Sequence, residues 1–402
     1  MSAKEKQPVF PVWMMSIVLL SALSFAWALG LEDVLAFQIA ARLILWFALL
    51  AAFVAALYGR RPPPLFVYEL SAEQVAARAL AIRCGLLGLL VFSNAMSAMF
   101  SSWPANTFNF EYLLALPFIL LLVPRYVAWA GRRIGIQEDN HERFGQVLKR
   151  QRAWCWAEQK PYLLAWCVKF FFIPMMYSFL VLAMEGMVLF SWQWSPTTLV
   201  LGLISFGLCF DLLIAFGGYL FSMRLLGGEI RSVDSNWLGW FACMICYPPL
   251  LVVFHYVKQQ VDDIVWSDWL LPNEPLYWLW AALVTGTWLV YWLATASFGL
   301  KFSNLSWRGL IDRGPYRYTK HPAYLAKNLY WWLHTVPFIG VHDGADLLRN
   351  ILGLTFVSLV YYLRAKTEEA HLLAFPEYAT YSARIEREGV FARMRGVFRR
   401  RI

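Results

Sequence analysis

The polar stretch from Asp312 to Pro322, DRGPYRYTKHP, lies between two apolar runs and carries the side chains most suited to chemistry. Pro322 suits the first turn of a following helix, where its missing N–H costs nothing. The first N–H groups and the positive dipole end of that helix favour an anionic group. His321, directly before the proline, can donate or accept a proton near neutral pH. A basic interface loop anchored by tyrosines is the alternative, and the Gly-Pro and His-Pro pairs weigh against it.

A second charged cluster follows in YYLRAKTEEAHLL, at residues 361–373. On a helix Arg364 and Glu368 are four residues apart and share one face, with Glu369 beside them. Two carboxylates suit a cationic ligand and an arginine suits an anionic one. A surface salt bridge is the simpler alternative. The segment after the next proline adds three polar side chains, those of Tyr378, Tyr381 and Arg384.

The composition places both clusters in an integral membrane protein. Of the 402 residues 60% are hydrophobic and 15% are charged, whereas soluble domains carry about 25% charged residues. The net charge of +9 does not indicate nucleic-acid binding, because Lys and Arg gather in short loops between apolar runs, as the positive-inside rule predicts. The first apolar run lacks a small-residue cleavage site and is interpreted as a retained anchor.

The elements that must position these residues are predicted to be membrane helices. Ten apolar runs approach the roughly 20 residues needed to cross a bilayer, at about 11–30, 34–58, 80–101, 110–130, 162–185, 197–223, 238–257, 277–299, 323–340 and 347–366. We therefore predict an all-α, polytopic membrane protein. The loops after every second run are basic and the opposite loops are acidic or neutral, so both termini are predicted to be cytoplasmic. We expect a bacterial inner membrane, or the endoplasmic reticulum if the source is eukaryotic.

A change in composition near residue 300 divides the chain into two predicted domains. Residues 1–299 are predicted to form a scaffold of about eight spans, and residues 300–402 a functional module with two spans and a basic tail. Within the scaffold, residues 131–161 are predicted to form a basic amphipathic helix on the anionic inner leaflet. The tail at 389–402 is interpreted in the same way.

Two charged residues within the upstream spans are candidates for function, Lys169 and Asp211. Placing a charge in the bilayer costs at least about 2.5–3.5 kcal/mol, so such residues are rare without a role. Lys169 is near enough to the end of its span to snorkel. Asp211 is deeper, and an interhelical pair and a substrate contact stay equally open. The CMIC sequence at 243–246 is interpreted as buried structural thiols, and no metal site is predicted.

Taken together, these motifs resemble the isoprenylcysteine carboxyl methyltransferase family and the related membrane phospholipid methyltransferases. The family pattern is Gly-x-Tyr…Arg-His-Pro-x-Tyr, then Arg…Glu-Glu…Leu, then Tyr-x-x-Tyr with a nearby Arg. The chain has these in the same order, as Gly314-Pro-Tyr316, Lys320-His321-Pro322-Ala-Tyr324, Arg364…Glu368-Glu369…Leu372 and Tyr378-Ala-Thr-Tyr381…Arg384. The resemblance covers about residues 300–390. Lys320 stands where the family has arginine, which keeps the charge but loses the bidentate fork.

The resemblance implies an S-adenosylmethionine-dependent methyltransferase that acts at the cytoplasmic face on a lipid or isoprenoid-linked acceptor, at its carboxylate or head group. It implies cofactor-binding roles for Tyr316, His321, Pro322, Tyr324, Glu368, Glu369, Tyr378 and Tyr381. It implies catalytic roles for Arg364, Lys320 and Arg384, with Arg364 nearest the acceptor. The expected partners are a membrane lipid or lipidated substrate and the bilayer, and no nucleic acid.

Two other functions are alternatives. A membrane sterol or isoprenoid reductase that uses NADPH has a related architecture, but its pattern lacks the combination of His-Pro-x-Tyr with Glu-Glu. A non-enzymatic lipid transporter or scaffold would be favoured by internal repeats and by charged residues in both halves, and the sequence shows neither.

Overall fold

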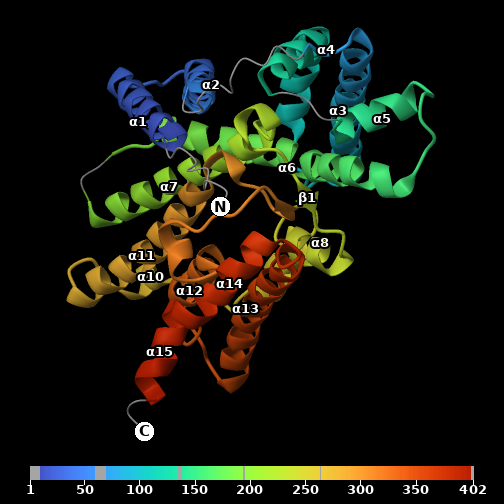
Figure 1. Ribbon diagram of the computed structural model, residues 1–402. Helices are drawn as coiled ribbons and strands as arrows, with labels where there is room; N and C mark the ends of the chain where they lie inside the picture. Colours follow the sequence, from blue (N-terminus) through green and yellow to red (C-terminus); the bar gives the residue numbers. More distant parts are fainter. Residues whose placement is uncertain (1–9, 59–68, 135–137, 193–194, 263, 400–402) are drawn as a thin grey trace. The chain divides into compact units, whose positions relative to one another are not determined.

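The computed structural model describes residues 10–58, 69–134, 138–192, 195–262 and 264–399. This part of the chain is mainly helical, as predicted for an all-α protein, and its strands are two residues long. Its helices are drawn in Figure 1, and they belong to two compact units. Unit 1 comprises residues 1–188, 212–233 and 300–308, and unit 2 comprises residues 189–211, 234–299 and 309–402. The predicted functional division into 1–299 and 300–402 stays a prediction.

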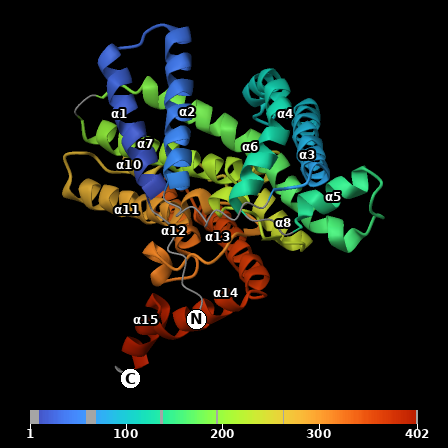
Figure 2. The ribbon, with the colours of Figure 1, turned by 45° about the horizontal axis from the view of Figure 1, so that its top comes forward.

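Unit 1 is built mainly from long apolar helices. They are α1 (Phe10–Leu29), α2 (Val34–Tyr58), α3 (Ala72–Met99), α4 (Asn106–Ile134), α6 (Trp156–Val188) and the second part of α7 (Pro196–Leu220), and the short polar helix α5 (Asn140–Leu148) accompanies them. The short elements are η1 (Arg224–Leu226), β1 (Ser232–Val233) and β2 (Ser306–Trp307), with β1 and β2 antiparallel. Helices α1 and α2 lie side by side, in blue in Figure 2.

Unit 2 holds both polar clusters found in the sequence. Its elements are the first part of α7, α8 (Trp237–Met244), α9 (Leu251–Lys258), α10 (Trp266–Trp269), α11 (Pro275–Phe298), η3 (Gly314–Arg317), α12 (Pro322–Thr335), α13 (Gly344–Leu372), α14 (Pro376–Glu388) and α15 (Val390–Arg399), with η2 (Gly299–Lys301) at the boundary between the units. Helix α11 packs against α12, and α12 packs against α13. One core cluster joins α11 to α10, and another joins α13 to α8 and α9.

Eight helices are long and apolar enough to cross a membrane: α1, α2, α3, α4, α6, α7, α11 with η2, and α13. Many large apolar side chains on them face outward, such as Phe118 at 70% and Leu121 at 68% exposure, as expected for a surface that contacts lipid. This confirms an integral membrane protein. The sidedness of the termini stays a prediction.

The count of ten spans is not confirmed. The run at 238–257 is divided between α8 and α9, which are 8 residues each and are separated by Pro248 and Pro249. The run at 323–340 forms α12, of 14 residues, and at 1.5 Å per residue such a helix is about 21 Å long, short of a bilayer core of about 30 Å. Apolar composition alone could not reveal the break between α8 and α9 or the short length of α12.

The segment 131–161 is not one helix. Its first residues end α4, residues 135–137 lie outside the described part, α5 follows, and α6 begins at Trp156. Helix α5 packs against α3 and α6 through a core of Ala81, Phe144, Tyr162 and Trp166. Its association with the inner leaflet stays a prediction.

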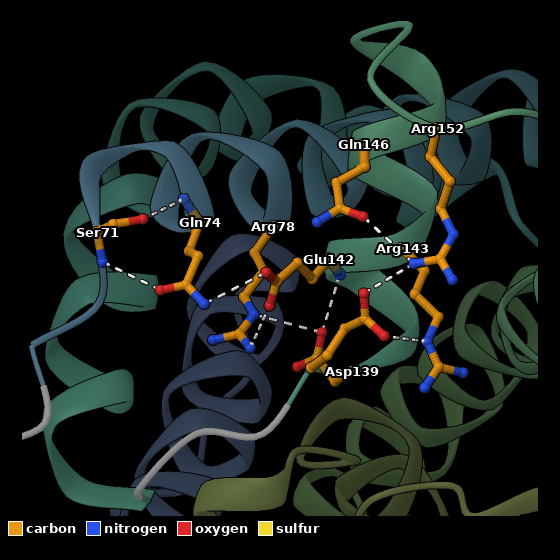
Figure 3. Close-up of polar contacts among 9 residues, drawn as sticks. Ser71, Gln74, Arg78, Asp139, Glu142, Arg143, Gln146 and Arg152 are labelled. Atoms are coloured by element: carbon orange, nitrogen blue, oxygen red, sulfur yellow. Dashed lines mark hydrogen bonds and ion pairs between the residues drawn. The ribbon is translucent and has the colours of Figure 1, made fainter.

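Helix α5 is joined to α3 by buried charge (Figure 3). Arg78 of α3 and Glu142 of α5 form an ion pair at 2.7 Å, and both side chains are 5% exposed. Asp139 caps the start of α5 by accepting from the N–H of Glu142 at 2.9 Å. Gly145 lies so close to the backbone of Ala77 that a Cβ would collide with its carbonyl oxygen. The small size of Gly145 and the ion pair between Arg78 and Glu142 therefore determine how closely α5 approaches α3.

Candidate functional site

The polar loop before α12 is held in place by Gly314 and by the start of α12 at Pro322. Gly314 has a φ of +58°, and a Cβ there would collide with the hydroxyl of Ser297 on α11. Only glycine combines that backbone conformation with so close an approach. Helix α12 then begins at Pro322, with His321 as the residue before it. The sequence prediction of a helix start at this proline is confirmed.

The second polar cluster lies at the end of α13 and on α14. Glu368 and Glu369 occupy the last two turns of α13, and α14 starts at Pro376. The hydroxyl of Tyr381 on α14 donates to the carbonyl of Tyr316 at 2.8 Å. This bond ties α14 to the loop before α12, so sequence segments more than sixty residues apart meet within unit 2.

Lys320 and Glu369 form the ion pair at the centre of this meeting point. Lys320 Nζ also contacts Glu386 Oε1 at 2.9 Å and the hydroxyl of Ser382 at 3.2 Å. Burial by itself disfavours the charged lysine, but the hydrogen bonds to Glu369 and Glu386 outweigh it, so the pKa of Lys320 is raised. Lys320 therefore stays charged and is engaged with carboxylates of the protein.

His321, Tyr324 and Glu368 form a second group beside that ion pair. The rings of His321 and Tyr324 stack with centroids 5.7 Å apart, and the hydroxyl of Tyr324 donates to Glu368 at 2.7 Å. Burial lowers the pKa of His321, although Glu368 and Glu369 act in the opposite direction. The His321 Nε2 is buried and has no hydrogen-bond partner among the described residues, and it lies 4.0 Å from a carboxylate oxygen of Glu369. A polar ligand atom would satisfy it.

Arg364 lies on the inner side of the same group. It is 6% exposed, and its guanidinium is 5.0 Å from the ring centre of Tyr324 and 5.8 Å from that of Tyr247. Its Nη2 approaches the thiol of Cys243 at 3.9 Å, so this thiol is a neighbour of the cation. The planar guanidinium suits recognition of a carboxylate or phosphate.

The remaining predicted residues surround this group. Tyr316, Tyr378 and Tyr381 are buried, the rings of Tyr378 and Tyr381 are 5.6 Å apart, and Pro322 is buried at the start of α12. Burial raises the pKa of each of the three tyrosines, so all three hydroxyls stay protonated at neutral pH. Arg384 is different, because its side chain is 42% exposed and its nearest acid is Asp312 at 4.0 Å. The structure brings the predicted residues together, with Arg384 at the margin.

Several residues of this region were not predicted from the sequence. Ser382 and Glu386 were not selected because they lie on a short polar helix where such residues are common. Lys327 had a clear signal, a lone cation in AYLAKNLYWWL, and a charge in such a run is a candidate for function. Tyr291 had none, because aromatic residues are ordinary in apolar helices, and Cys243 was interpreted only as a buried structural thiol.

The arrangement combines carboxylates, aromatic faces and cations in one small region of unit 2. Carboxylates hold an ammonium group or hydroxyls, aromatic faces hold a flat ring or a cation, and Arg364 holds an anion. Such a region is suited to a ligand with charges of both signs.

No curated protein and no solved structure matches the chain, but one family model matches residues 278–374. This segment covers about a quarter of the chain and extends from α11 to the end of α13. It includes Lys320, His321, Tyr324, Arg364, Glu368 and Glu369 and ends before α14. The model is that of the isoprenylcysteine carboxyl methyltransferase (ICMT) family, which supports a membrane methyltransferase acting on a lipid or isoprenyl acceptor and confirms the resemblance that the motifs predicted.

Proposed function

We propose that the protein is a membrane methyltransferase that uses S-adenosylmethionine and methylates a lipid or isoprenoid-linked acceptor, at its carboxylate or head group, from the cytoplasmic face. The observation that carries the proposal is the cluster of His321, Tyr324, Glu368 and Glu369, which lies within the segment that matches the family. The acceptor enters laterally from the bilayer in this proposal, which accounts for a polar site within an apolar protein.

The residues present fit the cofactor. S-adenosylmethionine carries an ammonium group, a carboxylate, ribose hydroxyls and an adenine ring. Glu368 and Glu369 would hold the ammonium group and the hydroxyls. The start of α12 would hold the carboxylate, and His321 Nε2, buried without a hydrogen-bond partner in the described part of the chain, would receive a polar atom of the ligand. The stacked rings of His321 and Tyr324 provide a flat face.

The bound cofactor supplies a methyl group on a sulfonium, whose transfer requires an in-line approach of the acceptor atom. Arg364 would orient an anionic acceptor by charge and by its planar donors. Lys320 would hold Glu369 in position, and Arg384 would act at the exposed margin. Because a sulfonium releases a neutral thioether, which is a good leaving group, positioning and exclusion of water would supply most of the catalysis.

The test is calorimetric titration of the purified protein in detergent with S-adenosylmethionine. We expect binding to the wild type and binding weakened by about tenfold in Glu369→Ala, since a lost charged hydrogen bond costs about 1.5–3 kcal/mol. Glu377→Ala is the matched control, because Glu377 is an exposed acid in the first turn of α14. No heat with the wild type would overturn the proposal, and binding unchanged in Glu369→Ala would overturn only the site assignment.

A second measurement identifies the reaction. Lipid extracts from cells with and without the protein, compared by mass spectrometry, are expected to differ by a species heavier by one CH₂ group. Binding of NADPH in place of S-adenosylmethionine would favour the reductase alternative.

A further inference from the structure

Helix α15, in red in Figure 2, follows α14 and packs against it. The side chains of Val390, Phe391 and Met394 are 41%, 52% and 50% exposed. Since successive residues of an α-helix are about 100° apart, these three lie within about 100° of one another and form one apolar stripe. Arg393 is exposed at the border of the stripe. Such a stripe bordered by a basic residue is typical of a helix that lies in a membrane interface.

The stripe follows closely on a membrane span. Helix α13 is long and apolar enough to cross the bilayer and ends at Leu372, and α14 begins at Pro376. Residues 389–402 contain five arginines and no acid. A second copy of the chain would bring the same positive charge, so it is disfavoured as the occupant of the stripe. Charge complementarity favours a bilayer surface with anionic head groups.

The loop 314–321, which carries residues of the proposed cofactor site, is bonded to α14 and to the start of α15. The N–H of Val390 donates to the carbonyl of Tyr318 at 2.9 Å. Gly389 lies so close that a Cβ there would be 2.8 Å from the same carbonyl oxygen. The hydroxyl of Tyr381 donates to two further carbonyls of the loop, at 2.8 and 3.3 Å. The conformation of the loop therefore depends on where α14 and α15 lie.

We propose that α15 docks on an anionic phospholipid surface, and that docking acts through the bond from Val390 to Tyr318 to fix the loop 314–321 in the conformation that binds the cofactor. This inference rests on the proposed function and adds a lipid partner that acts on the same site. Docking restrains the first residue of α15, which is the donor of the bond, and local opening at that residue releases the loop. Both α14 and α15 lie beyond the segment that matches the family, which ends at residue 374.

The test compares the protein in two kinds of nanodisc, each holding one protein. One kind is phosphatidylcholine alone, and the other contains about 30% phosphatidylglycerol, which gives an anionic surface. With phosphatidylglycerol, hydrogen exchange is expected to be slower both in α15 and in the loop 314–321. The affinity for S-adenosylmethionine, measured by calorimetry, is expected to rise about fivefold, a typical coupling between two sites. Inorganic phosphate added to the phosphatidylcholine discs is expected to change neither property, because it offers no surface for the apolar stripe.

Two substitutions in α15 weaken the docking itself. Phe391→Ser removes the most exposed apolar side chain of the stripe. Arg393→Gln removes one charge, and a charge near an anionic surface contributes about fivefold to binding. Each is expected to speed exchange in α15 and in the loop together when phosphatidylglycerol is present. Leu348→Ser is the matched control, since Leu348 is 57% exposed at the opposite end of α13, and we expect it to respond to the lipid as the wild type does.

Val390→Pro separates docking from its effect on the loop. Proline is tolerated at the first position of a helix and removes the N–H. The preceding Gly389 already has an extended backbone, with φ −69° and ψ 173°, as a residue before proline requires. In this variant α15 is expected to respond to phosphatidylglycerol as in the wild type. The loop and the affinity for S-adenosylmethionine are expected to be the same in both lipids.

Two results would overturn the inference. One is exchange of α15 in the wild type that is the same with and without phosphatidylglycerol. The other is a loop that responds to the lipid in Val390→Pro as it does in the wild type. If the wild type gives no heat with S-adenosylmethionine while α15 and the loop respond together through the Val390 N–H, the proposed function fails and the lipid docking stands.

Discussion

Lys320 of the loop before α12 forms an ion pair with Glu369 at the end of α13. The side chains are 16% and 11% exposed. The same ammonium contacts Glu386 of α14, a carboxylate whose side chain is 60% exposed. One lysine thus joins three segments of unit 2, and its position is the one at which the chain departs from the arginine of the family pattern. At this position the compact ammonium of a lysine, which two acids share, replaces the planar guanidinium of an arginine.

The Lys320–Glu369 pair is expected to stabilise unit 2. In a double-mutant cycle of Lys320→Met and Glu369→Gln, without ligand, we expect a coupling free energy of about 1–2 kcal/mol, because breaking a largely buried pair leaves a charge without its partner. The cycle of Lys320→Met with Glu386→Gln is the control, with an expected coupling below about 0.5 kcal/mol for an exposed partner. Thermal unfolding in detergent measures both. Equal couplings would show that burial of the Glu369 pair contributes nothing.

Tyr324 is expected to position Glu368 for the cofactor. Tyr324→Phe removes the hydroxyl that donates to Glu368 at 2.7 Å and keeps the ring that stacks on His321. We expect the affinity for S-adenosylmethionine to fall about three- to tenfold, less than the full worth of a hydrogen bond to a charged group, because Tyr324 acts on the cofactor only through Glu368. Tyr362→Phe is the control, since Tyr362 is 58% exposed on the same region of the chain. An unchanged affinity in Tyr324→Phe would remove Glu368 from the cofactor site.

The motif residues could be found from sequence because their types are unusual at the edge of an apolar run. His321, Glu368 and Arg364 stood out for that reason, and the structure brings them together through the packing of α12 on α13. The partners of Lys320 could not be found, because a helical sequence with several acids does not show which one faces a given lysine. Asp211 was recognised as unusual, but its bond to Tyr291 depends on how α7 and α11 pack, which a single sequence does not specify.

Gly145 is expected to be essential for the packing of α5 on α3. Gly145→Ala introduces a Cβ that collides with the backbone of Ala77, and a rigid backbone atom cannot move aside as a flexible side chain can. We expect a loss of more than about 1 kcal/mol of stability and faster hydrogen exchange in α5. Gly186→Ala on α6 is the control, because a Cβ there meets nothing within 4 Å, and we expect a gain of about 0.5–1 kcal/mol from helix propensity. Similar effects of the two substitutions would contradict the close packing of α5.

His141 is expected to make unit 1 sensitive to acid. Burial lowers the pKa of His141 to about 4, with Asp139 acting in the opposite direction and Lys169 and Arg78 adding to the decrease. The unfolded chain, with a histidine pKa of about 6.5, therefore binds more protons than the folded chain between the two values. The contribution of His141 to stability is full above pH 6.5, falls as the pH decreases, and reaches its minimum below about 4.

His141→Asn removes this titration. At pH 5 we expect the variant to have lost about 2 kcal/mol less stability than the wild type, relative to pH 7.5. Thermal unfolding at the two pH values gives the difference, and hydrogen exchange locates it in α5. Parallel pH profiles for the variant and the wild type would show that His141 is not buried in its neutral form.

The long helices could be predicted from sequence because about 20 apolar residues in a row have few other stable structures in lipid. The limits of α12 and the break between α8 and α9 were not predicted, because the runs at 323–340 and 238–257 are apolar on average and about as long as a span, although Lys327 interrupts the first and Pro248 and Pro249 interrupt the second. The 131–161 segment was misjudged as one helix for a related reason. Its basic character was visible, but the ion pair between Glu142 and Arg78 depends on the packing of α5 against α3, which is far away in the sequence.

Arg308 is expected to be required for the folding of unit 1, although it lies at no predicted site. It is 3% exposed and donates to three carbonyl oxygens, those of Gly228 at 2.6 Å, Gly218 at 2.9 Å and Phe302 at 2.8 Å. Burial lowers its pKa to about 9, so it is still charged at neutral pH. Through these bonds one side chain connects the end of α7, the loop before β1 and the loop before β2.

Arg308→Met leaves those carbonyl groups without their donor and is expected to cost about 3 kcal/mol or more, since each buried unsatisfied group costs about 1–3 kcal/mol. Arg308→Lys restores the charge, but one ammonium cannot span three acceptors that a planar guanidinium reaches, so we expect only partial recovery. Arg231→Met is the control, because Arg231 is an exposed arginine directly before β1. Thermal unfolding, with hydrogen exchange over residues 228–233, distinguishes the three variants, and wild-type stability in Arg308→Met would contradict a structural role for the buried guanidinium.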